Sequence, residues 1–367
     1  MYIFIFFILF LYIVLIGTYI FGWKKNNISQ VNFNDITVSV VVAMRNEELN
    51  IFNLINDIKK QDYPKKKWEL VIVNDHSTDN SLNIAIEHST DNVRVINMKK
   101  NDFGKKKALT VAVETCKSDI ILVTDADCRV KTTWIRKMVN YFNDQNINLV
   151  SGPVVFKNST AILTQLQSLE FASLIGSSAG AIGINNAILC NGANMAYRKN
   201  VFLKFSNYNM NSIASGDDVF LLHNIKKEFP KSIVFAKDED TIVETNACDT
   251  VTDFINQRKR WTAKSIHYKD FYTRYVSYVV FLTNFSMIIF FLASFFNLLS
   301  LKLFFLFFLI KFFIDMTFLY SVLKFFKRIY LIKWMFFFEI VYSFYIVLIS
   351  LLSLSSSFDW KGRIHTR

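Results

Sequence analysis

The sequence predicts an α/β fold, with a mostly parallel sheet in the middle of the chain and membrane-spanning helices at both ends. Three observations lead to this fold class. Between residues 38 and 156, short β-rich runs alternate with polar, helix-like stretches; apolar residues gather at the two ends; and acidic residues follow several of the β-rich runs. Such alternation of strand and helix is typical of βαβ units on a parallel sheet.

The first 22 residues predict a transmembrane anchor. They carry no charge and are long enough to cross a bilayer. Lys24 and Lys25 follow at once, and a positive flank favours a cytoplasmic location for the segment after the helix. A cleaved signal peptide is the alternative, but it needs a basic n-region and a small-residue cleavage site, and neither is visible.

Residues 23–250 are predicted to form one catalytic domain around five β-rich runs. In an open parallel sheet, ligands bind beyond the carboxyl ends of the strands, so the polar residues that end or follow each run are candidates for a site. Glu47 follows the first run, Asp75 ends the second, and Asp125 and Asp127 come at the end of the fourth. The five runs are Val38–Met44, Trp68–Asp75, Val93–Met98, Ile120–Asp125 and Leu149–Phe156.

The string TDADC at residues 124–128 is a candidate metal site. In extended backbone, residues two apart point to the same side, so Asp125 and Asp127 can converge on one hard cation such as Mg²⁺ or Mn²⁺. Such an ion keeps positions open for phosphate oxygens, and its charge stabilises a leaving diphosphate. A plain turn or a cap before a helix at Thr133 is the alternative. The acidic residues at the other strand ends favour the metal site.

Residues 275–357 predict three further membrane spans, separated near Lys302 and near residues 324–328. Lys311 and Asp315 lie one helical turn apart in these spans, so we expect a mutual ion pair that faces the helix bundle. Guidance of a polar acceptor is the alternative role. The basic tail, residues 358–367, falls outside in this topology, which the positive-inside rule disfavours. The side of the membrane on which the tail lies therefore stays open.

Charge and cysteine content add little to this prediction. The net charge of +12 suits a protein that lies against anionic lipid and handles a diphosphate, but it specifies neither. We expect no nucleic-acid partner. The four cysteines show no paired metal-ligand spacing, and a cytoplasmic domain would keep them reduced. They are Cys116, Cys128, Cys190 and Cys248.

Six motifs around the TDADC string occur in an order and spacing that resemble the membrane-bound family 2 glycosyltransferases. They are VVVAMRNEE (Val40–Glu48), VIVNDHSTDNS (Val71–Ser81), GKKKAL (Gly104–Leu109), NGANMAYRK (Asn191–Lys199), SGDDVFLL (Ser215–Leu222) and QRKRW (Gln257–Trp261). The resemblance covers residues 38–261 and implies a GT-A fold, a Rossmann-like nucleotide-sugar-binding domain. In such a membrane-bound enzyme of a bacterial inner membrane, the catalytic domain would face the cytoplasm.

The resemblance also assigns the donor site. It implies that Asp75 binds the uracil or the ribose, with Glu47 nearby, and that Lys105 points toward the nucleotide. A carboxylate can accept hydrogen bonds from ring N–H or hydroxyl groups, and a lysine supplies a point charge for phosphate. The alternative for Asp75 is an Asx-turn that caps a helix begun near Ser77. For Lys105, the alternative is an ordinary solvated run of charges.

In SGDDVFLL, the resemblance implies that Asp218 is the general base and that Asp217 helps to orient the acceptor. The pattern predicts the start of a helix, because turn and cap residues precede an apolar stretch. An inverting transfer needs one carboxylate opposite the departing diphosphate, to deprotonate the attacking hydroxyl. The alternative is structural, since acids in a first helical turn are favoured by the helix dipole.

Residues 251–274 are predicted to form an interfacial segment that carries the QRKRW motif. Gln257 matches the family at the right offset, Arg260 offers a planar fork for the diphosphate, and Trp261 offers a face on which an acceptor can stack. Anchoring at the membrane interface is the alternative for Arg260 and Trp261. Residues 163–184, an apolar stretch with a few polar residues, predict either an amphipathic interfacial helix or a core helix.

Together these observations predict a metal-dependent, inverting transfer of a hexose or N-acetylhexosamine. The donor would be a UDP-sugar, the cofactor Mg²⁺ or Mn²⁺, and the acceptor a membrane lipid or glycan in envelope synthesis. One alternative is a processive polysaccharide synthase of the poly-N-acetylglucosamine or cellulose type, although three C-terminal spans argue mildly against a self-contained export channel. An alternative of another class is an inactive nucleotide-sugar-binding scaffold subunit.

Overall fold

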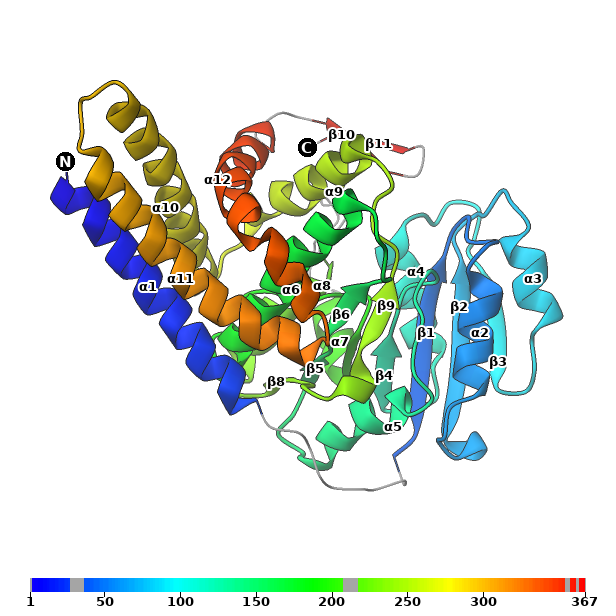
Figure 1. Cartoon of the computed structure of the whole chain (residues 1–367). Coiled ribbons are helices and arrows are strands. Elements are labelled where there is room, and N and C mark those ends of the chain that lie inside the picture. Colours follow the sequence, from blue (N-terminus) through cyan, green and yellow to red (C-terminus); the bar gives the residue numbers. More distant parts are fainter. Residues whose placement is uncertain (1, 27–35, 207–216, 354–356, 361–362, 367) are drawn as a thin grey trace. The chain divides into compact units, whose positions relative to one another are not determined.

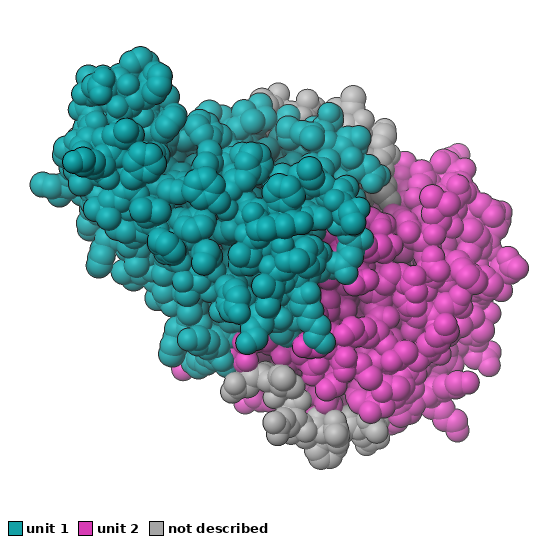
Figure 2. Space-filling model, viewed as in Figure 1, with its two compact units in different colours: residues 1–25, 158–186, 247–367 teal, residues 26–157, 187–246 magenta. Residues whose placement is uncertain are grey.

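The computed structural model describes residues 2–26, 36–206, 217–353, 357–360 and 363–366 (Figure 1). The chain divides into two compact units, which Figure 2 distinguishes by colour. Unit 1 contains residues 1–25, 158–186 and 247–367, and unit 2 contains residues 26–157 and 187–246. Residues 158–186 lie inside the segment predicted as the catalytic domain, but they group with the helices of unit 1.

Unit 2 is built on a seven-stranded sheet with the order β3-β2-β1-β4-β7-β5-β8. Strands β3, β2, β1 and β4 run parallel to one another, as do β5 and β8, whereas β7 is antiparallel to both of its neighbours. The mostly parallel α/β sheet predicted from the sequence is therefore confirmed. The strands are β1 (Val38–Met44), β2 (Trp68–Asn74), β3 (Val93–Asn97), β4 (Ile120–Val123), β5 (Leu149–Ser151), β7 (Met195–Arg198) and β8 (Ile233–Phe235).

The central strands form because they are runs of β-branched and other apolar residues that are buried on both faces. Val40, Val41 and Val42 of β1 are fully buried, as are Leu70 and Ile72 of β2. Near-continuous apolar strands of this kind are typical of parallel sheets covered by helices. The helical elements of unit 2 are α2 (Ile51–Lys59), η1 (Lys65–Lys67), α3 (Ser81–Glu87), α4 (Lys105–Thr115), α5 (Trp134–Val139), η2 (Asn140–Asn143), α7 (Lys199–Ser206), α8 (Asp217–Glu228) and η3 (Glu239–Thr241).

The run predicted as one strand over Leu149–Phe156 is two strands, so this prediction is wrong. Only β5 joins the main sheet, whereas β6 (Val154–Phe156) pairs in parallel with β9 (Val243–Thr245) in a second sheet. The break falls at Gly152 and Pro153. Proline has no N–H for a strand ladder, and a Cβ on Gly152 would overlap the side chain of Asn194. The Asn194 amide in turn donates to the Pro153 carbonyl at 2.8 Å.

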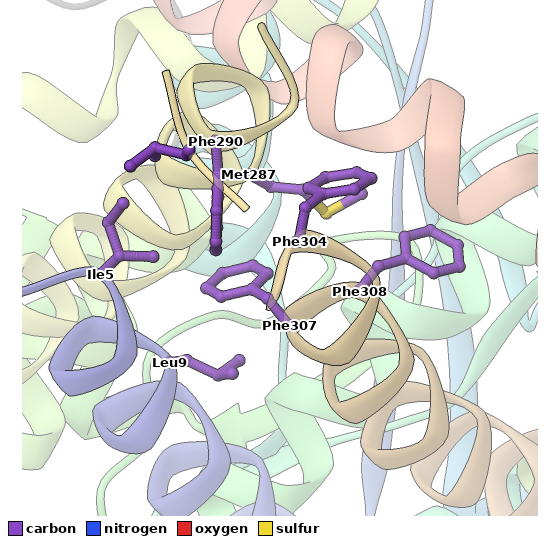
Figure 3. Packing of buried hydrophobic residues seen from close by; sticks show 8 residues of the cluster. Ile5, Leu9, Met287, Phe290, Phe304, Phe307 and Phe308 are labelled. Carbon is purple, nitrogen blue, oxygen red and sulfur yellow. The ribbon is translucent and has the colours of Figure 1, made fainter. Parts of the chain in front are cut away.

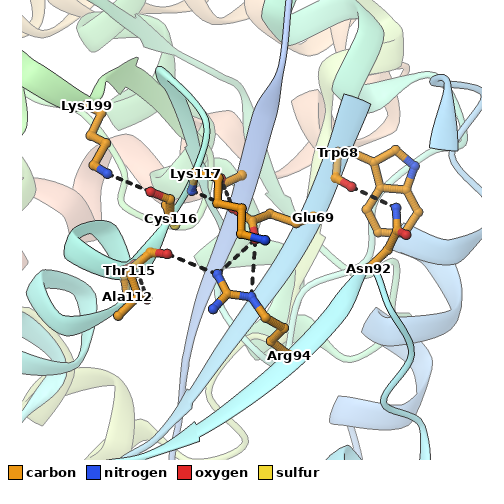
Figure 4. Close-up of polar contacts among 10 residues, drawn as sticks. Trp68, Glu69, Asn92, Arg94, Ala112, Thr115, Cys116, Lys117 and Lys199 are labelled. Carbon is orange, nitrogen blue, oxygen red and sulfur yellow. Dashed lines mark hydrogen bonds and ion pairs between the residues drawn. The ribbon is translucent and has the colours of Figure 1, made fainter. Parts of the chain in front are cut away.

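A polar cluster around Glu69 ties together the amino-terminal ends of three neighbouring strands (Figure 4). The Glu69 carboxylate of β2 accepts hydrogen bonds from the Ser39 hydroxyl of β1 at 2.6 Å and from Arg94 of β3 at 2.9 Å. It also accepts one from the backbone N–H of Lys117 at 2.9 Å, just before β4. Burial opposes the charge of Glu69, but the Lys117, Ser39 and Arg94 donors together lower its pKa below the usual value.

Unit 1 is helical, and four of its segments are long and apolar enough to cross a membrane. These segments, among the described residues, are Tyr2–Lys25, Phe271–Phe295, Leu301–Phe325 and Ile329–Leu352, and they match the one N-terminal and three C-terminal spans predicted from the sequence. The elements are α1 (Tyr2–Lys25), α6 (Ile162–Gly183), α9 (Val251–Ala263), η4 (Ser265–His267), α10 (Phe271–Phe295), α11 (Leu301–Phe325), η5 (Ile329–Trp334), α12 (Met335–Leu352) and the hairpin β10 (Ser357–Trp360) and β11 (Arg363–Thr366).

An aromatic cluster holds three of these candidate spans together (Figure 3). Phe290 of α10 lies at the centre, with its ring centroid 6.1 Å from that of Phe307 and 5.9 Å from that of Phe304, both in near-perpendicular arrangements. Edge-to-face contacts of this kind are favourable because the ring edge is positive and the ring face negative. Ile5 and Leu9 of α1 complete the cluster. Some of the 38 phenylalanines of the chain therefore pack the helices together.

The contact between α1 and α6 is close enough to require glycine. A Cβ on Gly22 of α1 would overlap the backbone of Gly180, and a Cβ on Gly183 would overlap the backbone of Gly22. The polar residues of α6 are buried: Gln165 is 7%, Gln167 1% and Glu170 4% exposed. The core-packing alternative for this segment is therefore confirmed, and the amphipathic interfacial helix is wrong, because the polar side chains find partners inside the unit.

The ion pair predicted between Lys311 and Asp315 is present in α11. The Lys311 ammonium lies 2.9 Å from an Asp315 oxygen and also contacts the Glu339 carboxylate of α12. The Tyr12 hydroxyl of α1 donates to Asp315 at 2.7 Å. Charges inside a helix bundle need such partners, because burial of an unpaired charge is costly. The sequence predicted the pair within one helix but not the contributions of Tyr12 and Glu339.

Candidate functional site

The sheet of unit 2 brings the predicted acidic residues to one edge. Because β1, β2 and β4 are parallel neighbours, the turns that follow them leave the sheet on the same side. Met44 at the end of β1 pairs with Asn74 at the end of β2, and the Thr124 N–H, just after β4, donates to Val41. Met195 at the start of the antiparallel β7 pairs with Val123, so the segment that leads into β7 reaches the same edge.

The turn after β1 and the loop after β2 are joined by hydrogen bonds between their backbones and side chains. The Asn46 side chain accepts from the Thr78 N–H at 2.8 Å, and the Glu47 N–H donates to the Ser81 hydroxyl at 2.6 Å. The Asn80 N–H donates to Glu48 at 3.0 Å. Reciprocal bonds of this kind fix both loops, so the acidic edge is shaped before any ligand binds.

The structure corrects the alternative proposed for Asp75. The Asx-turn is made by Asn74, whose side-chain oxygen accepts from the Ser77 N–H at 3.2 Å. The helix α3 begins at Ser81, not near Ser77. Asp75 does not cap α3, because the N-cap residue of this helix is Asn80.

Asp75 is held in a buried position between two loops. It is 2% exposed, and one of its oxygens lies 3.1 Å from the His76 ring nitrogen Nδ1. The other oxygen accepts from the Gly104 N–H at 3.1 Å. Gly104 has a φ of +95°, which glycine adopts without strain, and the neighbouring Phe103 ring lies 4.6 Å from the His76 ring. Asp75 thereby fixes the chain that leads into α4.

Lys105 begins α4 and points at the predicted metal site. Its ammonium contacts the Asp125 carboxylate, so Lys105 is not simply part of a solvated run of charges. Asp127 accepts a hydrogen bond from the Thr245 hydroxyl at 3.0 Å. Burial raises the pKa of Asp127, and the negative charges of Asp125 and Glu47 raise it further. This edge of the sheet is therefore an acidic cluster that a bound cation would stabilise.

These residues suit a divalent ion that takes part of its coordination from a substrate. Among the described residues, no group of three or more His, Cys, Asp or Glu side chains is arranged to hold a metal alone. Two carboxylates nevertheless offer the hard oxygen donors that Mg²⁺ and Mn²⁺ prefer, and phosphate oxygens can fill the remaining positions. A cation at this position would offset the burial and the repulsion by Asp125 and Glu47 that raise the pKa of Asp127.

Asp218 lies in the first turn of α8, which confirms the helix predicted from the sequence. One of its oxygens accepts from the Gly192 N–H at 3.0 Å, and Gly192 belongs to the segment that leads into β7. Asp217 is the first residue of α8, but its side chain lies outside the described structure, as do residues 215–216. The structure therefore supports the position of Asp218 and leaves that of the Asp217 side chain open.

Two contributors to the acidic edge were not assigned from the sequence. The Gly192 N–H orients Asp218, and the NGANMAYRK motif offered a signal for it. Thr245 orients Asp127 from 118 positions further along the chain, and no local pattern marks it.

The QRKRW motif lies on α9 of unit 1. Thr250 caps this helix, because its hydroxyl oxygen accepts from the Asp253 N–H at 3.1 Å. Gln257 accepts a hydrogen bond from Arg258, and the Arg258 guanidinium lies 4.2 Å from the centroid of the Trp261 ring. Arg260 is half-buried. These contacts of the motif lie within unit 1, whereas the candidate carboxylates belong to unit 2.

Comparison with known proteins agrees with this arrangement. Residues 39–205 match the family model described as glycosyl transferase family 2. The match covers less than half of the chain. The matched segment contains Glu47, Asp75, Lys105, Asp125 and Asp127.

Two curated relatives match part of the chain. Glycosyltransferase AglE of Haloferax volcanii is 31% identical over 121 residues, which are 32% of this chain and 40% of the relative. Poly-beta-1,6-N-acetyl-D-glucosamine synthase of Staphylococcus aureus is 26% identical over 156 residues, which are 42% of this chain and 37% of the relative. The match therefore spans less than half the length of either relative.

One solved structure resembles nearly the whole chain. A mannosyltransferase of Pyrobaculum calidifontis, in complex with GDP-Man and Mn²⁺, has a TM-score of 0.60 and 15% sequence identity. The likeness covers 93% of this chain and 96% of the mannosyltransferase chain. With the mostly parallel sheet, it confirms the GT-A fold predicted from the sequence.

Proposed function

We propose that this protein is a membrane-bound inverting glycosyltransferase. It transfers a hexose or N-acetylhexosamine from a UDP-sugar to a hydroxyl of a membrane lipid or glycan in envelope synthesis. The observation that carries the proposal is the acidic edge. Glu47 and Asp125 lie close enough to Asp127 for their charges to raise its pKa, Asp75 binds the Gly104 N–H next to Lys105, and Asp218 binds the segment that leads into β7. The four candidate spans in the same chain support an acceptor at the membrane.

The donor nucleotide binds along the ends of β1 and β2. Asp75 binds the uracil or the ribose, with Glu47 beside it, because a carboxylate accepts hydrogen bonds from ring N–H and hydroxyl groups. Lys105 exchanges its contact with Asp125 for a phosphate oxygen of the donor. The segment that holds Lys105 also carries Gly104, whose N–H binds Asp75, so the two donor contacts are linked.

Asp125 and Asp127 would hold the Mg²⁺ or Mn²⁺ ion. When bound, the ion supplies positive charge that stabilises the diphosphate as its bond to the sugar breaks. Thr245 orients Asp127, and Lys105 balances Asp125 before the donor arrives. The Mn²⁺ in the structure of the Pyrobaculum calidifontis mannosyltransferase supports this assignment.

Asp218 is the general base of the proposed transfer. It takes the proton from the acceptor hydroxyl while the hydroxyl oxygen attacks the anomeric carbon from the face opposite the diphosphate. Single displacement from that face inverts the configuration at the anomeric carbon. The Gly192 N–H fixes one oxygen of Asp218, which orients the carboxylate, and we assign to Asp217 the orientation of the acceptor.

The QRKRW motif binds the diphosphate and the acceptor. We assign Gln257 and Arg260 to the diphosphate and the Trp261 ring to stacking on an acceptor sugar or lipid neck. The motif precedes α10, the second candidate span. Lys24 and Lys25 in the last turn of α1 favour a catalytic domain on the cytoplasmic side of a bacterial inner membrane.

Processive polymer synthesis is the second candidate function. The match to the Staphylococcus aureus poly-beta-1,6-N-acetyl-D-glucosamine synthase favours it.

The test is a donor screen with membranes that contain the protein, with and without a chelator, and with the product identified by mass. We expect transfer from a UDP-sugar, its loss with chelator and its return with Mn²⁺. One added sugar indicates a single transfer, and a ladder of sizes indicates a polymer.

The Asp218→Asn substitution separates the enzyme from an inactive scaffold. Asparagine keeps an oxygen for the Gly192 N–H but cannot take a proton, so we expect a loss of about 10²- to 10⁴-fold in transfer rate. The matched control is Asp91→Asn, an exposed acid that precedes β3 at the opposite edge of the sheet. Full transfer or complementation by Asp218→Asn would refute the assignment of the base.

A further inference from the structure

Arg258 is a buried charge at the centre of the QRKRW motif that none of the proposed steps uses. Its side chain is 2% exposed, although it lies on a helix whose other motif residues are only partly buried. A buried guanidinium is costly unless each of its donor groups finds a partner. The partners of Arg258 therefore indicate what the charge does.

One side of the guanidinium is bound by Glu170 of α6. The Arg258 Nε donates to one Glu170 oxygen at 3.0 Å, and a second guanidinium nitrogen contacts the other oxygen. Such a two-point pair fixes both the distance and the plane of the guanidinium. Glu170 is 4% exposed and also accepts from the Tyr345 hydroxyl of α12 at 3.2 Å. The pair thereby joins α6, α9 and α12.

The other side of the guanidinium reaches two residues of the motif. The remaining nitrogen, Nη1, donates to the side-chain oxygen of Gln257. The guanidinium carbon lies 4.2 Å from the centroid of the Trp261 ring and 4.6 Å from that of Phe254. A cation over an aromatic face is attracted to it. The planar guanidinium thus fixes the orientation of both the Gln257 amide and the Trp261 ring.

We propose that the Glu170–Arg258 pair is a positioning unit that orients Gln257 and Trp261 for glycosyl transfer. The inference rests on the proposed function, because it takes those two residues as the ones that meet the diphosphate and the acceptor. A purely structural pair would be replaceable by apolar side chains of similar volume, which often hold helices equally well. The charged pair adds the fixed plane that apolar side chains cannot supply.

The first test is kinetic. Arg258→Lys keeps the charge but loses the planar fork, and Arg258→Met loses both; the matched control is Lys259→Met, which removes the next charge on the same helix. We expect kcat to fall about 100-fold in Arg258→Met and about tenfold in Arg258→Lys, since small misplacements of binding groups can cost this much. The KM for the donor should change less than kcat. Equal losses in Arg258→Met and Lys259→Met would overturn the proposal.

A double-mutant cycle shows whether Arg258 acts through Trp261. If it does, adding Arg258→Met to Trp261→Ala should lower kcat little further, because the ring that Arg258 orients is already gone. Additive losses would overturn the proposal. Arg258→Met leaves Glu170 buried without its partner, so the variant that replaces both, Glu170→Gln with Arg258→Met, is measured as well. A melting temperature near that of the wild type, together with a low kcat, supports positioning.

A readout without turnover separates this inference from the proposed function. The emission of Trp261 is obtained as the difference between the wild type and Trp261→Phe, and its quenching by acrylamide reports how firmly the ring is covered. We expect stronger quenching in Glu170→Gln/Arg258→Met and no change in Lys259→Met; unchanged quenching overturns the proposal. If Asp218→Asn is inactive while the Arg258 variants keep wild-type kcat, the positioning inference alone fails. If Asp218→Asn is fully active, the proposed function fails first.

Discussion

The Asp127 carboxylate depends on residues that are far away in the sequence. Its hydroxyl donor, Thr245, comes from β9. Burial and the nearby Asp125 raise its pKa, and the charge of Glu47, which is distant in the sequence, raises it further. A carboxylate that is expected to bind a metal works best when a second group fixes its orientation, because the ligand then loses less freedom on binding. Thr245 supplies that group here.

Thr245→Val tests this role at constant side-chain shape. Removal of the hydroxyl leaves Asp127 free to turn, so we expect the Mn²⁺ concentration for half-maximal transfer to rise about tenfold. The measurement is the transfer rate against Mn²⁺ concentration, with Thr90→Val, an exposed threonine before β3, as the control. An unchanged Mn²⁺ requirement would show that Thr245 does not support the metal ligand.

Glu69 carries a second prediction at this scale, and it concerns stability. Although burial opposes its charge, its donors lower its pKa in the folded protein. The carboxylate therefore adds stability that is fully present above its unfolded pKa of about 4.3 and is lost as the pH falls through the lower, folded value. Glu69→Gln leaves Arg94 without its ionic partner and should cost about 1 kcal/mol at neutral pH.

Melting temperatures across pH measure the effect of Glu69→Gln. The melting temperature should drop by about 2–4 °C at neutral pH, and the difference from the wild type should shrink below a pH of about 4. Glu87→Gln, at the exposed end of α3, is the control and should melt like the wild type at both pH values. A difference that stays constant with pH would contradict an ionic role for Glu69.

At the scale of elements, α1 is more than a membrane anchor. Its Gly22 lies against Gly180 and Gly183 of α6, so close that neither side can accept a Cβ without a shift of backbone. Small residues at helix contacts let backbones approach, and dispersion and weak C–H···O contacts then stabilise the pair. The helix that begins the chain is therefore part of the fold of unit 1.

Gly22→Ala and Gly17→Ala in the same helix form a matched pair. A Cβ on Gly22 would overlap the Gly180 backbone, whereas a Cβ on Gly17 meets nothing within 4 Å. We expect Gly22→Ala to lower the melting temperature of the detergent-solubilised protein, with a cost of about 1–3 kcal/mol for overpacking. Gly17→Ala should leave it unchanged or raise it, because alanine favours a helix. Equal effects would contradict a close α1–α6 contact.

At the scale of the whole molecule, one chain combines a segment that matches the family 2 model with apolar helices, four of them among the described residues, that match membrane spans in length and composition. Many large apolar residues of these helices are exposed, for example Phe4, Phe295, Phe313 and Leu351. Exposed apolar surface of this extent is unfavourable in water, and a bilayer would cover it. The net charge of +12 adds attraction to anionic lipid.

The membrane assignment predicts how the protein partitions. After cells are broken, the protein should stay in the membrane pellet through an alkaline carbonate wash and leave it only in detergent, because apolar spans are held by burial rather than by charge. A peripheral enzyme bound through its basic residues is the control and should be released by the wash. Release of this protein by carbonate would contradict the four spans.

The sequence by itself determined the first four strands of the sheet and the candidate spans. The strands β1 to β4 begin at the residues predicted from their apolar runs, and the candidate spans follow from long, mostly apolar stretches, because both signals are local. The ion pair of Lys311 with Asp315 was predictable for the same reason, since both lie on one helix face. Glu47, Asp75, Asp125 and Asp127 were also visible, as they stand next to the strand ends, whereas Asp218 was marked by the SGDDVFLL motif.

Only the tertiary structure decided which distant groups support these residues. The hydroxyl of Thr245 on Asp127, the N–H of Gly192 on Asp218 and the carboxylate of Glu170 on Arg258 join positions 118, 26 and 88 apart in the chain. The break at Gly152 likewise depends on Asn194, 42 positions later in the numbering. Such partners leave no periodic pattern, because they are selected by proximity after the strands and helices have packed.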